Sequence, residues 1–150
     1  MTTGRTLIAF AALFAAMAIA PAPAAVGMLT IIAGADQNPD PSGQPSPVAI
    51  RVYELAASAR FERADVFALT ERERQTLGED DLGSEEFLLS PGETRTVTRE
   101  LKKGVQLIGV VVLFRDIDHA QWRALAPVGA SGPMRLVLRT SALGVTLAAS

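Results

Sequence analysis

Two carboxylates lie beside the chain's one histidine, at Asp116, Asp118 and His119. A carboxylate pair next to an imidazole can hold a divalent ion or move protons in acid–base catalysis. No third ligand can be identified, and the sequence contains no Gly-x-Ser-x-Gly, phosphate-loop or His-Glu-x-x-His motif. We therefore expect a polar turn after a strand, with no catalytic residue, no cofactor and no metal. A metal-dependent enzyme is the alternative.

A second group of oxygen-bearing side chains occupies alternate positions, namely Asp36, Asn38, Asp40 and Ser42. This is the spacing of the first ligands in the calcium loop of an EF-hand. That loop requires glycine at its sixth position and a bidentate glutamate at its twelfth, where this chain has Pro41 and Pro47. Asp and Asn are also common in turns that precede proline. The pattern therefore predicts a loop without bound calcium.

The composition excludes several classes of protein. The 150 residues include no cysteine, so the chain has no disulfide, no thiolate metal site and no cysteine nucleophile. Its formal charge is −2, with 14 basic and 16 acidic residues, and this balance gives nucleic acid no basic surface to bind. The length and the apolar content of 49% indicate one globular domain.

The loop at residues 34–47 stands out because it holds four of the nine prolines. It is longer than the two to five residues that a plain hairpin needs, and its prolines restrict its backbone. A stiff polar loop loses little conformational entropy on binding, which suits a protein-recognition surface. A crossover between two sheets, with no binding role, is the alternative.

Most of the remaining sequence has the patterns of β-strands. Val48, Ile50 and Val52 alternate with Ala49, Arg51 and Tyr53, which predicts one face toward a core and the other toward water. Residues 26–33 are apolar enough to be buried on both faces. Further strands are expected at Phe87–Leu89, Thr94–Leu101, Val105–Phe114, Met134–Thr140 and Leu143–Leu147. About seven short strands predict a mainly β, two-sheet sandwich.

Residues 61–82 are the exception and predict a short helical insert. Thr70 and Glu73 match a capping box, and Gly78 stands where a glycine would end the second helix. The side chains expected to face the core from this insert are Phe61, Phe67, Leu69 and Leu77.

The N-terminus resembles a secretory signal peptide. Arg5 precedes an uncharged run at residues 7–20, which is shorter than the roughly 20 residues of a membrane span. Small residues at Ala22 and Ala24 match the positions that a signal peptidase reads. We expect residues 1–24 to be a signal peptide and residues 25–150 the exported domain. An uncleaved N-terminal anchor is the alternative.

An ordered set of short motifs covers nearly the whole expected domain. In chain order these are Leu29–Ala33, Asn38–Asp40, Ser46–Val48, Arg51–Leu55, Phe61–Leu69, Leu77–Gly78, Leu89–Gly92, Phe114–Asp116 and Trp122–Arg123. Together they resemble the type VI secretion lipoprotein family, TssJ or VasD. The resemblance implies a transthyretin-like β-sandwich with an added helical segment.

The resemblance also implies a function, which is structural and not enzymatic. Members of the family sit in the periplasm at the inner face of the outer membrane. There they bind the periplasmic C-terminal domain of TssM, within a larger complex that includes TssL. The family makes this contact through the loop between its first two strands, which corresponds here to residues 35–47. The partner-binding residues expected on that basis are Asp36, Gln37, Asn38, Pro39, Asp40, Pro41, Ser42 and Gly43.

The chain departs from the family in one respect. Family members carry a lipidated cysteine at the end of the signal peptide, and this sequence has no cysteine. Any association with the outer membrane is therefore not expected to use a lipidated Cys. Besides the metal-dependent enzyme, a carrier that holds a small apolar ligand inside the sandwich is the remaining alternative.

Overall fold

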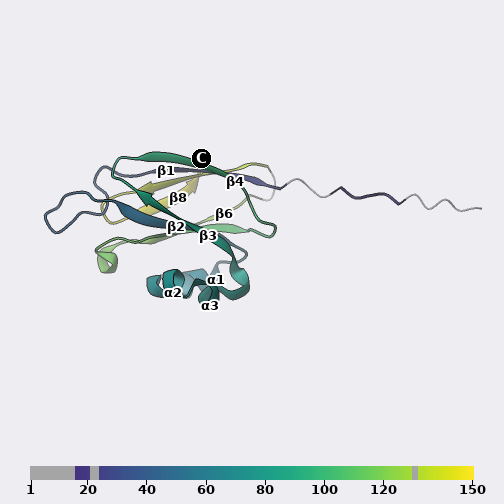
Figure 1. The fold of residues 1–150 in the computed structure, drawn as a ribbon, viewed down its shortest axis with the longest axis horizontal. Helices are drawn as coiled ribbons and strands as arrows, with labels where there is room; N and C mark the ends of the chain where they lie inside the picture. The colour runs from purple at the N-terminus through teal and green to yellow at the C-terminus, as the bar shows by residue number, and fades with distance from the viewer. Residues whose placement is uncertain (1–15, 21–23, 130–131) are drawn as a thin grey trace, which may run out of the picture.

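The computed structural model describes residues 16–20, 24–129 and 132–150 as a β-sandwich of two four-stranded sheets. We call the sheet with strand order β4-β1-β7-β8 sheet A, and the sheet with order β3-β2-β5-β6 sheet B. The strands are β1 Val26–Ile32, β2 Val48–Leu55, β3 Asp81–Leu89, β4 Thr94–Glu100, β5 Leu107–Val112, β6 Arg123–Pro127, β7 Met134–Thr140 and β8 Val145–Ala149. Sheet A, sheet B and a helical layer are stacked in that order (Figure 1). The predicted mainly β, two-sheet fold is confirmed.

Strand β1 lies inside sheet A, antiparallel to β4 and parallel to β7. Leu29 and Ile31 face sheet B and are buried, whereas Met28, Thr30 and Ile32 on the outer face are half-buried. The expectation that this strand is buried on both faces is therefore wrong. The helices cover the outer face of sheet B instead of that of sheet A (Figure 1).

Strand β2 contributes side chains to two hydrophobic cores, one on each of its faces. Val48 and Ile50 belong to the core between the sheets, while Tyr53 and Leu55 belong to a second core beneath the helices. The face that includes Tyr53 was expected to meet water, but this ring is fully buried and packs edge-on against Phe61 at 5.3 Å between ring centroids. Its hydroxyl donates to the carbonyl of Leu69 at 3.0 Å, so the buried polar group is satisfied.

The helical segment between β2 and β3 comprises α1 Ala59–Arg63, α2 Val66–Glu71, α3 Glu73–Leu77 and a 3-10 turn at Gly78–Asp80. Asp65 is the N-cap of α2, and its side chain accepts a hydrogen bond from the backbone N–H of Ala68 at 2.8 Å. Gly78 is the C-cap of α3, and it has a φ of 55° that glycine adopts without strain.

Two expectations for this segment are corrected. The capping box does not form, because the Thr70 hydroxyl donates to Val66 O at 2.8 Å within α2 and the residue that precedes α3 is Arg72. Phe67 is 61% exposed, because α2 turns Val66, Ala68 and Leu69 toward the sheet and leaves Phe67 outward. The other three side chains expected to face the core are fully buried, namely Phe61, Leu69 and Leu77.

The expected signal peptide lies largely outside the described residues. Of residues 1–24, the structure describes only 16–20 and 24, and all of these are exposed. In the described part of the chain, no helix is long and apolar enough to cross a membrane.

Candidate functional site: the loop between the first two strands

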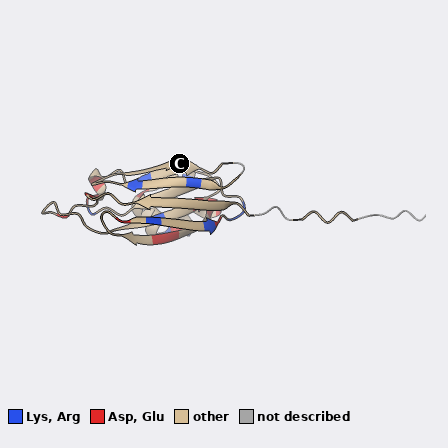
Figure 2. Cartoon of the chain, turned by 90° about the horizontal axis from the view of Figure 1, so that it is seen from above, with Lys and Arg blue, Asp and Glu red and all other residues tan. Residues whose placement is uncertain are grey.

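The loop at residues 33–47 extends from one end of the sandwich, and β1 begins at the other end (Figure 1). The view onto sheet A shows the same arrangement (Figure 2). This follows from the direction of β1, which runs along the sandwich and ends where the loop begins. The eight residues expected to bind a partner therefore lie at the end remote from the first residue of β1, Val26.

Gln37 fixes the base of the loop to both sheets. Its side chain is fully buried, and its Nε2 donates to the carbonyl of Leu89, the last residue of β3, at 2.9 Å. Its Oε1 accepts from the hydroxyl of Thr140, the last residue of β7, at 2.6 Å. Because β3 belongs to sheet B and β7 to sheet A, this one amide bridges the end of the sandwich.

Asn38 fixes the next residue of the loop to the segment before β2 and to the connection after β5. Its Nδ2 donates to Ser46 Oγ at 3.0 Å and to Pro47 O at 2.9 Å, and its Oδ1 accepts from the backbone N–H of Arg115 at 2.8 Å. Its φ of 47° is in the left-handed region, where asparagine is among the best tolerated residues after glycine. The side chain is 3% exposed, so these bonds lie away from water.

Because these two amides are buried, their side chains cannot be the ones that contact a partner. Gln37 and Asn38 were expected to offer their side chains to a partner, but both are turned inward and their polar atoms are occupied. The residues of the predicted set that remain at the surface are Asp36, Pro39, Asp40, Pro41, Ser42 and Gly43. The base of the loop, at Gln37 and Asn38, therefore supports it. The tip, at residues 39–43, is the surface that a partner can reach.

Asp40 organises the tip of the loop. Its Oδ1 accepts from Ser42 N at 2.9 Å, from Ser42 Oγ at 2.7 Å and from Gln44 N at 3.0 Å. The bond from the Ser42 hydroxyl, followed by that from the Gln44 backbone, lowers the pKa of Asp40 because hydrogen bonds favour the charged carboxylate. The carboxylate thus closes a turn of its own chain, and the tip is ordered before any partner arrives.

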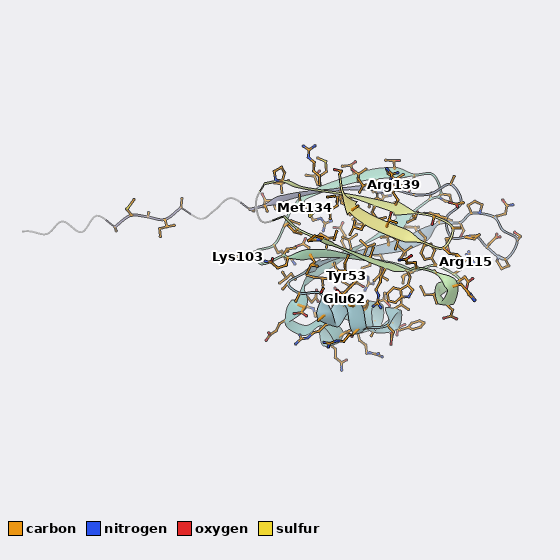
Figure 3. The ribbon with its side chains drawn as sticks, turned by 180° about the vertical axis from the view of Figure 1, so that it is seen from behind. Tyr53, Glu62, Lys103, Arg115, Met134 and Arg139 are labelled. Atoms are coloured by element: carbon orange, nitrogen blue, oxygen red, sulfur yellow. The ribbon has the colours of Figure 1, made fainter. Side chains whose placement is uncertain are left out.

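A cleft separates this tip from two other connections. It has a volume of about 400 Å³ and is lined by Pro39, Asp40, Pro41, Arg115, Asp116 and Leu143. Arg115 and Asp116 belong to the connection from β5 to β6, and Leu143 to the turn from β7 to β8. Arg115 is exposed, and Figure 3 shows it at the loop end of the domain, while Lys103 is at the opposite end.

The cluster considered for acid–base or metal chemistry forms a surface turn. His119 Nδ1 lies 2.7 Å from Asp116 Oδ1, and the two side chains are 77% and 50% exposed. This hydrogen bond raises the pKa of His119. Asp118 lies in the short 3-10 helix Ile117–His119 between them, and the described residues contain no group of three metal-ligating side chains. The pair closes a turn after β5, and nothing here favours the enzyme alternative.

The space between the sheets does not favour the carrier alternative either. The cavity found there has a volume of about 30 Å³ and is lined largely by apolar side chains, including Leu29, Val52 and Phe87. Sites for small ligands usually measure roughly 300–1,000 Å³. This cavity has room for about one water molecule.

Sequence reasoning missed three residues that build the loop, namely Ser46, Arg115 and Thr140. Thr140 lies 103 residues from Gln37 and Arg115 lies 77 residues from Asn38, whereas Ser46 is only 8 residues from Asn38. Phe114–Asp116 and Ser46–Val48 were among the motifs that carry the family resemblance, which was the signal that Arg115 and Ser46 had a role.

Comparison with known proteins identifies a family that matches most of the chain. Residues 27–149 match a family model described as "Type VI secretion lipoprotein, VasD, EvfM, TssJ". No match is found among curated proteins compared by sequence.

Three solved structures are similar. The T6SS lipoprotein TssJ1 from Pseudomonas aeruginosa is 35% identical, with a TM-score of 0.81 over 85% of this chain and 98% of that chain. A chain in a structure described as a type VI membrane complex is 25% identical, with a TM-score of 0.75 over 84% and 99%. A structure described as the T6SS protein TssM C-terminal domain from EAEC matches in fold at 24% identity, with a TM-score of 0.67 over 83% and 98%.

Proposed function

The chain belongs to the type VI secretion lipoprotein family, and on that basis we propose that it is a structural component of a type VI secretion membrane complex. We further propose that it acts in the periplasm, at the inner face of the outer membrane, by binding the periplasmic C-terminal domain of TssM. TssL belongs to the same proposed assembly. The similarity to a chain of a type VI membrane complex supports an envelope-associated role.

The observation that best supports the proposed contact with TssM is the order of the loop. Gln37 and Asn38 hold its base to both sheets and to Arg115, and Asp40 closes its tip. A partner that binds this loop does not have to order it first, so less conformational entropy is lost on association. The loop has almost no large apolar side chain, so it adds little to the hydrophobic core. These features support a binding role for the loop.

Shortening the tip tests the contact. Deleting residues 41–43 removes three exposed residues of the tip and leaves Gln37, Asn38 and Ser46 in place, so the sandwich should melt as in the wild type. Titration calorimetry with the periplasmic C-terminal domain of TssM should then show a loss of binding. Lys103→Ala, at the opposite end of the domain, is the control and should bind normally. A shortened chain that melts and binds like the wild type would show that the loop is only a connector.

The N-terminus calls for a separate proposal. We propose that residues 1–24 are removed on export and that the protein carries no fatty acid, because no cysteine can accept one. Intact-mass measurement of the exported protein should show a chain that begins at Ala25 without an acyl group. A full-length mass in the membrane fraction would instead favour an uncleaved anchor.

A further inference from the structure

The cleft beside the loop brings together three connections at one end of the domain. Pro39 and Pro41 come from the loop, Arg115 and Asp116 from the connection after β5, and Leu143 from the turn after β7. The walls of the cleft are fixed, because Asn38 N donates to Ala142 O at 3.0 Å and Arg115 N donates to Asn38 Oδ1 at 2.8 Å. The cleft is therefore part of the folded domain and does not depend on a partner to form it.

The charged groups in the cleft differ in how they are satisfied. The carboxylate of Asp40 accepts three hydrogen bonds from its own turn, and that of Asp116 is bonded to His119. Arg115 is held through its Nε, which donates to Ser46 Oγ at 3.3 Å. Within the described residues its two Nη groups donate no hydrogen bond, and no carboxylate forms an ion pair with the guanidinium. Arg115 is thus the cation of the cleft, and its Nη groups have hydrogen-bonding capacity left for an anionic ligand.

The chemistry around the guanidinium indicates what would complement it. The planar fork of arginine matches a carboxylate, to which it can donate two parallel hydrogen bonds. The rings of Pro39 and Pro41 and the side chain of Leu143 provide an apolar surface beside it. A complementary segment therefore carries a negative side chain next to an apolar one.

We propose that this cleft receives an Asp or Glu side chain of the protein partner, flanked by an apolar residue, and that Arg115 binds the carboxylate. This inference rests on the proposed function, because the partner is the one that the loop contacts. It adds a binding residue outside the loop and gives the chemical character of the segment that docks there. Arginine in such a position is enriched among residues that dominate the energy of protein interfaces.

Three variants of the full chain test the proposal, each titrated with the periplasmic C-terminal domain of TssM in low and in high salt. Arg115→Gln removes the charge and should weaken binding at least tenfold at low salt. Arg115→Lys keeps the charge without the fork and should give an intermediate affinity. Arg139→Gln is the matched control, because Arg139 is an exposed arginine on β7, and it should bind within about twofold of the wild type.

The salt dependence separates binding from support of the fold. If Arg115 forms an ion pair, the affinity of the wild type falls as salt rises and that of Arg115→Gln falls less. Melting temperatures of all variants show whether the fold is retained. Equal affinities of Arg115→Gln and wild type would overturn the cleft proposal alone, as would an affinity loss that does not depend on salt. Absence of binding by the wild type would overturn the proposed partner and the cleft proposal with it.

Discussion

Replacing Asn38 with alanine should lower the free energy of unfolding more than any other single side-chain replacement in the loop. The side chain makes three hydrogen bonds at 2.8–3.0 Å in a site that is 3% exposed. Each is worth about 1 kcal/mol, and alanine in the left-handed backbone of this position adds up to about 1 kcal/mol. The expected loss in the free energy of unfolding is therefore about 3–4 kcal/mol.

The assay is thermal and urea unfolding followed by circular dichroism. A loss of this size lowers the melting temperature of a domain of this length by roughly 10 °C or more. Asn38→Gly tolerates the backbone conformation and should show only the cost of the lost hydrogen bonds. Ser42→Ala, at the exposed tip, should cost less than about 1 kcal/mol. If Asn38→Ala unfolds within about 1 kcal/mol of the wild type, the loop is not held as described.

Three further changes have defined outcomes. Tyr53→Phe should lower the free energy of unfolding in urea by about 1–2 kcal/mol, because the carbonyl of Leu69 loses the hydrogen bond from the buried hydroxyl. Burial also raises the pKa of Tyr53, so the folded protein should show no phenolate absorbance near pH 10. Phe61→Ala should cost about 3–5 kcal/mol, whereas Phe67→Ala should change stability by less than about 0.5 kcal/mol, and equal losses would contradict the orientation of α2. His119 should titrate above 6.5 in an NMR experiment, and any stability from its ion pair should be present below that pH and fade as pH rises through the raised pKa; His119→Ala should leave TssM binding intact.

The strands could be predicted where burial imposes a period of two, and missed where it does not. Val48 and Ile50 alternate with less buried residues, so β2 was evident. Strand β6 was missed because five residues ending at Pro127 give too short a pattern, and proline is unusual in a strand except at an edge, where β6 lies. Strand β3 begins at Asp81, earlier than expected, because its first half is polar and Gly83 weakens the strand signal.

The position of the binding loop was predicted from the sequence, but the direction of two of its side chains was not. Proline content and length identify the loop as stiff, since these are local properties of the sequence. The inward direction of Gln37 and Asn38 could not be predicted, because it depends on acceptors and donors in distant strands. Thr140, which donates to Gln37, is 103 residues away. Without that partner, a polar side chain in a loop is expected to face water.

The parallel pairing of β1 with β7 has a consequence for how the domain folds. The first strand that leaves the ribosome, or a membrane channel, cannot complete its sheet until one of the last strands has followed. Gly34 N, just after β1, donates to a threonine 106 residues later in the chain. Such non-local topology slows folding, because a long loop must close before its contacts stabilise it. The apolar β1 is therefore expected to remain unpaired on the β7 side during synthesis. During that time its exposed edge is the part of the chain that a chaperone would need to cover.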